Sequence, residues 1–215
     1  NAVDTAHFSQ KYPKEELDAL KRKLGKKSDE KYIITTSRLV HKNAVDDVIV
    51  ALVGLPETVK FLILGSGPDE AALKDLAKEN GVSDRVMFLG QVDHKEMPKY
   101  LKISDVFTRP SRSEGFGISF VEAMAAEIPV VATQEGGLAD FLFDPDRNKD
   151  KKPTGIAVNA SDPKDLARGL KRALEDTELL RNMVPQAARM VREKYDWNLI
   201  AKNMREKVFG SLFEK

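Results

Sequence analysis

The sequence contains no cysteine, which excludes disulfide bonds, thiolate nucleophiles and cysteine-ligated zinc. Charges of the two signs nearly cancel, with 35 lysines and arginines against 34 aspartates and glutamates, so a general surface for nucleic acid is not expected. No apolar run approaches the ~18 residues that a membrane-spanning helix needs. The histidines, His7, His41 and His94, share no metal-ligand spacing, and we expect surface or capping roles for them. What remains is a globular chain of 215 residues, enough for one large domain or two small ones.

Short runs of β-branched residues alternate with amphipathic runs through most of the chain. We expect strands at Tyr32–Ser37, Lys60–Leu64, Arg85–Leu89, Asp105–Thr108, Pro129–Ala132 and Gly155–Val158. We expect helices at Pro13–Leu24, Val45–Leu55, Asp69–Asn80, Lys95–Ile103, Ile118–Ala126 and Leu138–Phe143, followed by a helical C-terminal third at Pro163–Glu175, Thr177–Tyr195 and Asn198–Phe213. This alternation is typical of an α/β fold with a six-stranded parallel sheet, right-handed crossovers and helices on both faces.

Polar or glycine-rich segments follow five of the expected strands. They are Arg38 with Lys42, Gly65–Pro68, Gln91–Val92, Pro110–Gly117 and Thr133–Gly137. In parallel sheets of this kind, ligands bind beyond the carboxyl ends of the strands, where the strand order reverses. We therefore expect these segments to converge on one rim of the sheet and to form one ligand site there.

The segment Ser111–Pro129 carries Glu114 and Glu122, with seven residues between them. Glu114 lies in a glycine-rich turn, whereas Glu122 lies in an apolar helical run, where a buried carboxylate is costly unless a group pairs with it. A glycine-rich turn that opens a helix offers free backbone N–H groups to a phosphate. Together these features predict a ligand with hydroxyls and phosphate, such as a sugar nucleotide. The alternatives are a helix carboxylate satisfied by the protein at Glu122 and a turn or capping residue at Glu114.

These segments resemble the C-terminal, donor-binding half of retaining family-4 (group 1) glycosyltransferases of the GT-B type. The resemblance covers nearly all of the chain, through N-A-V-D-T from Asn1, S-R-L-V-H-K-N from Ser37, I-L-G-S-G-P from Ile63, F-L-G-Q-V from Phe88, P-S-R-S-E-G-F-G-I-S-F-V-E-A-M-A-A from Pro110, P-V-V-A-T-Q-E-G-G from Pro129, D-P-K-D-L-A from Asp162 and Y-D-W-N-L-I-A from Tyr195. It implies one Rossmann-like domain over residues 1–215, with a hinge segment at 1–12 and a terminal crossing helix at 196–215.

The resemblance also implies what this chain works with. Enzymes of this type bind a nucleoside diphosphate sugar, here with both UDP and GDP plausible, and the resemblance requires no metal cofactor. Their N-terminal acceptor-binding domain is absent from this chain, so we expect the isolated half to bind a donor without transferring the sugar. The intact enzyme is expected in the cytoplasm, with peripheral membrane contact through its other half.

The resemblance assigns site residues one by one. Arg38 and Lys42 match the basic pair that neutralises the departing diphosphate, Glu114 matches the residue that positions the sugar, and Glu122 matches the residue that binds the ribose diol. The other donor-binding positions are Gly65 and Gly67 near the nucleotide or phosphates, Val92 and Met97 at the base, and Gly115, Phe116, Gly117 and Ile118 at the sugar and phosphate. Ordinary core packing for Val92 and Met97, and plain turns for the glycines, remain alternatives.

Some positions depart from this pattern. Many relatives have a lysine five residues after the arginine and then a glycine, whereas this chain has Asn43 and Ala44, with Lys42 one residue earlier. A glycine usually follows M-A-A, where this chain has Glu127; a non-glycine residue in a left-handed helix cap costs roughly 1 kcal/mol. Two rival interpretations remain open. A nucleotide-sugar epimerase would lack a reason for the E-x7-E segment. The other rival is a non-catalytic Rossmann binding module, either excised or designed or with a degenerate site, and Asn43 and Ala44 would fit partial degeneration.

Two further expectations concern the rest of the chain. The Asp144-Pro-Asp146 segment imitates a D-x-D metal site, but its charged surroundings favour a solvated, mobile loop. Trp197, the single tryptophan, is expected to anchor the terminal helix to the core.

Overall fold

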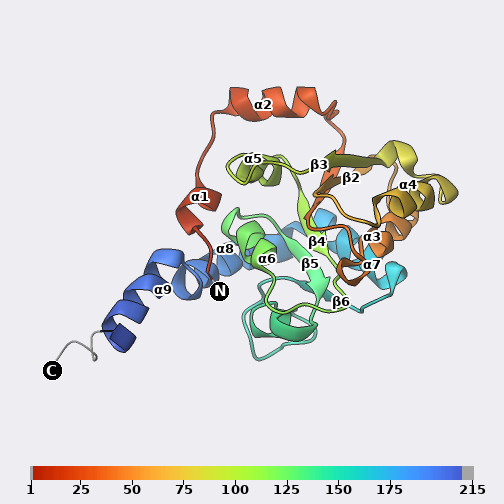
Figure 1. The fold of residues 1–215 in the computed structure, drawn as a ribbon. Coiled ribbons are helices and arrows are strands. Elements are labelled where there is room, and N and C mark those ends of the chain that lie inside the picture. Colours follow the sequence, from red (N-terminus) through yellow and green to blue (C-terminus); the bar gives the residue numbers. More distant parts are fainter. Residues whose placement is uncertain (1, 210–215) are drawn as a thin grey trace.

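The computed structural model describes residues 2–209. Its strands are β1 Lys31–Thr36, β2 Val59–Leu64, β3 Val86–Gly90, β4 Val106–Arg109, β5 Val130–Thr133 and β6 Ile156–Val158. They form one parallel sheet in the order β3-β2-β1-β4-β5-β6, so the strand order reverses between β1 and β4 (Figure 1). Each strand agrees with its prediction to within one residue at either end, which confirms the predicted α/β Rossmann-like sheet.

Helices cover both faces of the sheet, as predicted (Figure 1). They are α1 Thr5–Ser9, α2 Lys14–Lys23, α3 Val45–Ala51, α4 Glu70–Glu79, α5 Met97–Lys102, α6 Ile118–Ala125, α7 Pro163–Glu175, α8 Thr177–Lys194 and α9 Trp197–Met204. Successive strand residues point to opposite faces. Ile33 therefore packs in the core beneath α3, α4 and α7, and Ile34 packs in the core beneath α1, α5 and α6.

Several helix predictions need correction. The run Val45–Leu55 is divided into α3 and a 3₁₀ turn at Leu52–Gly54. The helix predicted at Leu138–Phe143 is wrong: a 3₁₀ helix occupies Gly136–Asp140 instead. Phe143 is outside any helix because its N–H and its carbonyl bond Thr154, at 2.8 and 2.9 Å. Helix α1 was not predicted within residues 1–12, for which the sequence analysis expects a hinge, and the predicted end at Phe213 lies outside the described residues.

The anchoring role predicted for Trp197 is wrong, because the Trp197 side chain is 62% exposed on α9, which projects from the body (Figure 1). The start of this helix is held by neighbouring residues. The backbone of Val3 bonds Tyr195 O and Trp197 N, both at 2.9 Å, and the carboxylate of Asp196 accepts the N–H groups of Asn198 and Leu199. The beginning of the described chain therefore lies against the start of α9.

The prediction of a solvated loop at Asp144-Pro-Asp146 is wrong for Asp144. Asp144 is 3% exposed, and its carboxylate accepts the N–H groups of Asp146, Arg147 and Ala157. It therefore fastens its own loop to β6. No group of three or more acidic or histidine side chains arranged for a metal ion occurs in residues 2–209.

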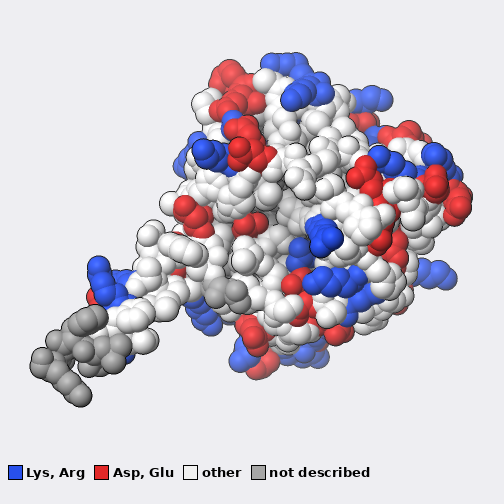
Figure 2. Space-filling model, in the orientation of Figure 1, with Lys and Arg blue, Asp and Glu red and all other residues white. Residues whose placement is uncertain are grey.

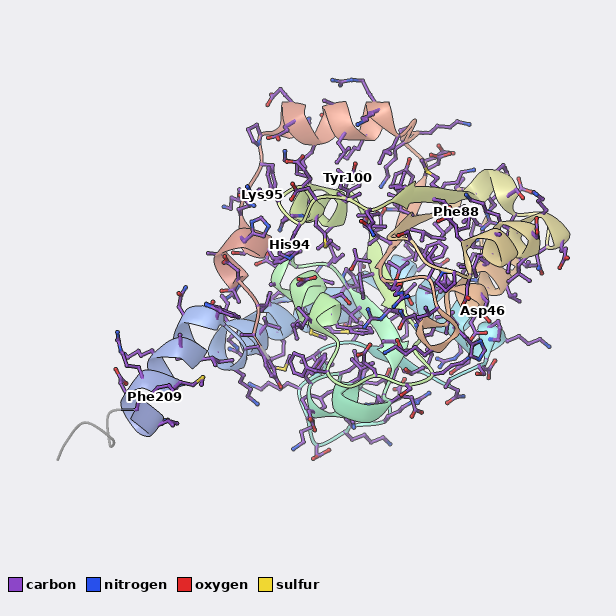
Figure 3. All side chains as sticks on the ribbon, viewed as in Figure 1. Asp46, Phe88, His94, Lys95, Tyr100 and Phe209 are labelled. Atoms are coloured by element: carbon purple, nitrogen blue, oxygen red, sulfur yellow. The ribbon has the colours of Figure 1, made fainter. Side chains whose placement is uncertain are left out.

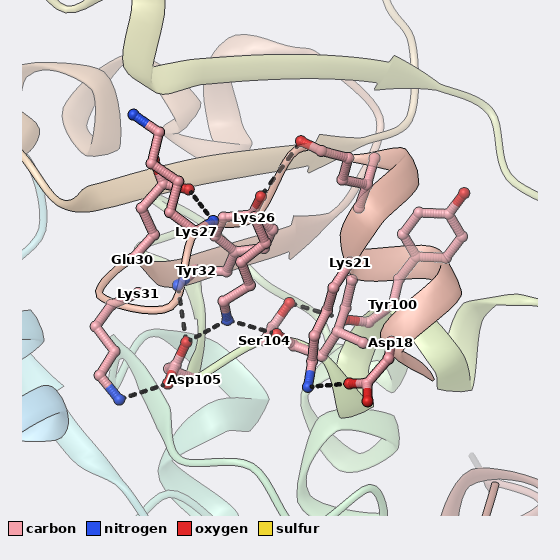
Figure 4. Close-up of polar contacts among 12 residues, drawn as sticks. Asp18, Lys21, Lys26, Lys27, Glu30, Lys31, Tyr32, Tyr100, Ser104 and Asp105 are labelled. Carbon is pink, nitrogen blue, oxygen red and sulfur yellow. Dashed lines mark hydrogen bonds and ion pairs between the residues drawn. The ribbon is translucent and has the colours of Figure 1, made fainter. Parts of the chain in front are cut away.

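A cluster of ion pairs joins the amino ends of β1 and β4, at the edge of the sheet opposite their carboxyl ends (Figure 4). Asp105 accepts the Tyr32 N–H at 2.8 Å and pairs with Lys26 at 2.9 Å and Lys31 at 3.0 Å. Burial alone would raise the pKa of Asp105, but these bonds outweigh it and hold the pKa below its usual value.

The face of the molecule drawn in Figure 2 carries positive and negative side chains intermixed. No helix of the described part is long and apolar enough to cross a membrane.

Glu127 occupies the left-handed conformation predicted for it, with φ 59°. Its N–H bonds Met124 O, and the next N–H, of Ile128, bonds Ala123 O, which is the Schellman pattern at the end of α6. A glycine at this position would avoid the steric cost of the Cβ atom.

We expect Glu127→Gly to leave the melting temperature equal or higher, with a gain of up to ~1 kcal/mol in unfolding free energy. The change removes an ion pair with Arg192 at 3.7 Å, but both side chains are about half exposed, so this loss is small. Glu127→Ala is the control, since it loses the same ion pair and keeps the Cβ atom. A clear fall in melting temperature for Glu127→Gly would contradict the prediction.

Candidate functional site

A cleft of about 600 Å³ opens at the carboxyl edge of the sheet. Its lining comes from the segments after β1, β2 and β3 and from α5 and α6, so these predicted loops do converge there. Six predicted site residues line it, namely Arg38, Gly65, Gly67, Val92, Met97 and Glu122. The cleft thus lies beside the reversal between β1 and β4, where parallel sheets place their ligands.

A second cavity, of about 760 Å³, adjoins the first because Arg38 lines both. Lys42 and Glu114, two further predicted residues, line this second cavity together with Arg109 and His41. Neither Arg38 nor Lys42 forms an ion pair with any described residue, so both cations are available to a bound anion. The two cavities together therefore contain two available cations and both glutamates of the E-x7-E segment.

The other four predicted residues, Gly115, Phe116, Gly117 and Ile118, line neither cavity. The Phe116 ring packs against Phe141 and Tyr195, with centroids 5.4 and 5.3 Å away. Gly117 has φ 79° and immediately precedes α6, and the Ile118 side chain is 45% exposed. Their expected contribution is through backbone groups, and it remains a prediction.

Glu122 is a buried carboxylate, 8% exposed, on α6. His94 lies on the surface beside α1 (Figure 3), as predicted, yet its Nε2 donates to Glu122 Oε1 at 3.1 Å. The His94 ring is itself held by His7, stacked at 5.4 Å, and by the edge of Phe8 at 5.3 Å. Within residues 2–209 no hydrogen bond reaches Glu122 Oε2, so one oxygen of this carboxylate remains for a ligand.

Two hydroxyls that sequence reasoning missed also line the cleft. Ser37 Oγ and Ser119 Oγ are buried and have no hydrogen-bond partner among the described residues. Buried polar atoms are normally paired, because an unpaired one costs roughly 1–3 kcal/mol. Their position, one after β1 and the other in the first turn of α6, marks the cleft as a place where a polar ligand would supply missing bonds.

The loop after β1 contains Asn43 and Ala44, the two positions that depart from the pattern of many relatives. Asn43 is buried, and its Nδ2 donates to Arg38 O at 2.7 Å. Ala44 takes the left-handed conformation, with φ 54°, at the position where many relatives have glycine. Asn43 therefore closes the loop that presents Arg38, and Lys42 supplies the second cation to the cavity.

Gly65 and Gly67 allow the loops after β1 and β2 to touch backbone to backbone. A Cβ atom on Gly65, which has φ 138°, would lie 1.9 Å from Ser37 O, and one on Gly67 would lie 2.1 Å from Leu39 O. Gly136 and Gly137 after β5 press in the same way on the carbonyls of Glu114 and Gly115. These glycines therefore fix the distances between the loops that form the site.

Comparison with known proteins supports a family. The sequence model described as glycosyl transferases group 1 matches residues 17–190. An uncharacterized glycosyltransferase of Methanocaldococcus jannaschii is 34% identical over 94% of this chain and 50% of its own length. A GDP-mannose-dependent mannosyltransferase of Corynebacterium glutamicum, acting on a monoacylated phosphatidylinositol monomannoside, is 29% identical over 95% of this chain and 53% of its own length. The chain thus spans about half the length of the curated relatives it matches.

Solved structures agree on the fold. The crystal structure of HepE from Anabaena in complex with UDP and glucose matches with a TM-score of 0.86, over 98% of this chain and 56% of that chain. The two sequences are 23% identical, so this likeness bears on the fold alone.

Proposed function

Because the chain belongs to the glycosyl transferases group 1 family, we propose that its two joined cavities bind a nucleoside diphosphate sugar, the donor of a glycosyl transfer. One observation carries the proposal. Arg38, which has no ion-pair partner, lies where the two cavities meet, with Glu122 in one cavity and Glu114 in the other. A nucleotide sugar has its diphosphate between two groups rich in hydroxyls, and this arrangement matches that order.

Each residue then has a definite task. Glu122, through its Oε2, accepts from the ribose diol, and the base lies by Val92 and Met97. The planar guanidinium of Arg38 can bind the diphosphate in a bidentate manner, and the ammonium of Lys42 acts as a point charge. Together they stabilise the negative charge that develops on the leaving group. Glu114 accepts from hydroxyls of the sugar. The donor is bound without a metal ion, because cationic side chains supply the charge.

The transfer itself is proposed to retain the configuration of the sugar. The acceptor approaches on the face from which the diphosphate departs, and an oxygen of the leaving phosphate takes the acceptor's proton. This step needs an acceptor-binding domain as a second wall of the cleft. The present chain, about half as long as its relatives, is therefore proposed to bind the donor without transferring it.

Calorimetric titration of the chain with UDP, GDP and ADP, first without metal and then with magnesium, tests this proposal. We expect saturable binding of UDP or of GDP without metal and no comparable binding of ADP. Magnesium is expected to change the affinity little, since Arg38 and Lys42 already face the site. Absence of binding by all three nucleotides would contradict the proposal and would favour a module whose site has degenerated at Asn43 and Ala44.

A further inference from the structure

Arg109 is a buried cation to which the proposed donor binding assigns no role. It ends β4 at the reversal of the strand order, and it is 8% exposed. Its guanidinium forms an ion pair with Glu114, and its Nε donates to Ser111 Oγ at 3.2 Å. The guanidinium also lies over the ring of Phe120, at 4.6 Å from the centroid. Desolvating a charge this far costs several kcal/mol unless partners compensate for it.

The arginine lies close to both glutamates of the E-x7-E segment. Burial lowers the pKa of Arg109, and the carboxylates of Glu114 and Glu122 act in the opposite direction. Among the described residues, Glu114 is the one carboxylate in direct contact with Arg109. The positive charge of Arg109 is therefore paired with Glu114 and does not lie on an open surface.

The contacts of Glu114 fix its carboxylate from two sides. Oε2 meets the Arg109 guanidinium, and Oε1 accepts the N–H of Gly115 at 3.0 Å. Each oxygen keeps a further lone pair that a hydroxyl can use. A carboxylate held in this way can accept hydrogen bonds from a sugar without losing side-chain entropy on binding.

The other cations of the same cavity make this fixation necessary. Arg38 and Lys42 line the cavity with Glu114 and have no described ion-pair partner. Opposite charges that line the same cavity attract each other. A Glu114 side chain released from Arg109 would turn toward Arg38 or Lys42 and neutralise the charge that a diphosphate needs.

We propose that Arg109 is a positioning residue for the donor sugar, which holds Glu114 in its hydroxyl-accepting orientation and keeps it away from Arg38 and Lys42. This inference rests on the proposed function, and it divides the cations Arg38, Lys42 and Arg109 between two roles. Two cations are reserved for the diphosphate, and the third is reserved for the carboxylate that meets the sugar.

Affinities of the 215-residue chain for UDP and UDP-glucose, or for GDP and GDP-mannose if GDP is the nucleotide bound, test this division. For Arg109→Met we expect nucleotide affinity to fall about tenfold and the extra affinity for the nucleotide sugar to disappear. The double variant Arg109→Met/Glu114→Gln should recover nucleotide affinity to within about twofold of wild type, because the freed carboxylate is gone, without recovering the preference for the sugar. Arg109→Lys, which keeps the charge, should retain most of the nucleotide affinity.

Arg85→Met is the matched control. Arg85 is equally buried, at 6% exposed, but it donates to carbonyls of Val59 and Pro56 at the amino edge of the sheet. It should lower stability and leave both affinities unchanged. If Glu114→Gln fails to rescue nucleotide binding in Arg109→Met, Arg109 supports the fold only and the proposal is overturned.

A ligand-free measurement separates this proposal from the donor-binding proposal. If the wild-type chain binds no nucleotide, donor binding fails, and crystal structures of wild type and Arg109→Met still decide the role of Arg109. We expect the Glu114 carboxylate to leave the Gly115 N–H and approach Arg38 in the variant. If Glu114 occupies the same position in both crystals, Arg109 does not hold it.

Discussion

Replacing Glu122 by alanine is expected to weaken binding of the preferred nucleoside diphosphate by ~1–3 kcal/mol, roughly 5- to 150-fold, while the fold persists. The carboxylate is buried at the cleft, with one oxygen bonded to His94 and the other without a described partner. A ribose diol bonded to this oxygen makes charge-assisted hydrogen bonds, which are stronger than neutral ones. Isothermal calorimetry on the wild type and the variant measures the loss directly.

The nucleotide itself provides the sharper control. With a 2′,3′-dideoxy nucleoside diphosphate the diol is absent, so the alanine substitution should cost almost nothing. His94→Ala, which removes the neighbour but keeps the carboxylate, should have a much smaller effect on the natural nucleotide than Glu122→Ala. An equal loss with the dideoxy ligand would mean that Glu122 supports the cleft rather than the ribose, and unchanged affinity with the natural ligand would remove Glu122 from the site.

Local patterns in the sequence were sufficient to predict the strands of the sheet and the polar segments at its carboxyl edge. Runs such as Val59–Leu64, bounded by turn residues, predict buried parallel strands, and the polar segments that follow them must then gather at one edge. The left-handed conformation of Glu127 was also predictable, because a helix end fixes it within a few residues. In all these cases the information lies within one turn or one strand.

The features that the sequence did not predict depend on contacts between distant segments. His94 meets Glu122 across 28 positions, and its ring is held by a helix at the start of the chain that no pattern indicated. Arg109 lies in a β-strand, where nothing local distinguishes a buried arginine from an exposed one. The failure for Trp197 is of the same kind: its size favours burial, but Tyr195 and Asp196 make the contacts that hold the helix.

Gly65 should tolerate no side chain. We expect Gly65→Ala to lower the unfolding free energy by about 2–4 kcal/mol, combining backbone strain with overpacking, and to abolish measurable nucleotide binding. The new Cβ atom would lie 1.9 Å from Ser37 O, which is backbone and cannot rotate away, so the loop that presents Arg38 must move. Denaturant unfolding measures the first effect and calorimetry the second.

Gly25→Ala separates the clash from the strain. Gly25 also has a positive φ, 71°, but a Cβ atom there would meet nothing within 4 Å, so its substitution should cost only about 1 kcal/mol. It should leave nucleotide affinity unchanged, because Gly25 follows α2 and lines neither cavity. Equal losses in the two variants would show that positive φ alone explains the cost. A larger loss in Gly65→Ala, together with lost binding, would mean that the close approach of the β1 and β2 loops builds the cleft, since it is this contact that fixes where Arg38 stands relative to Glu122.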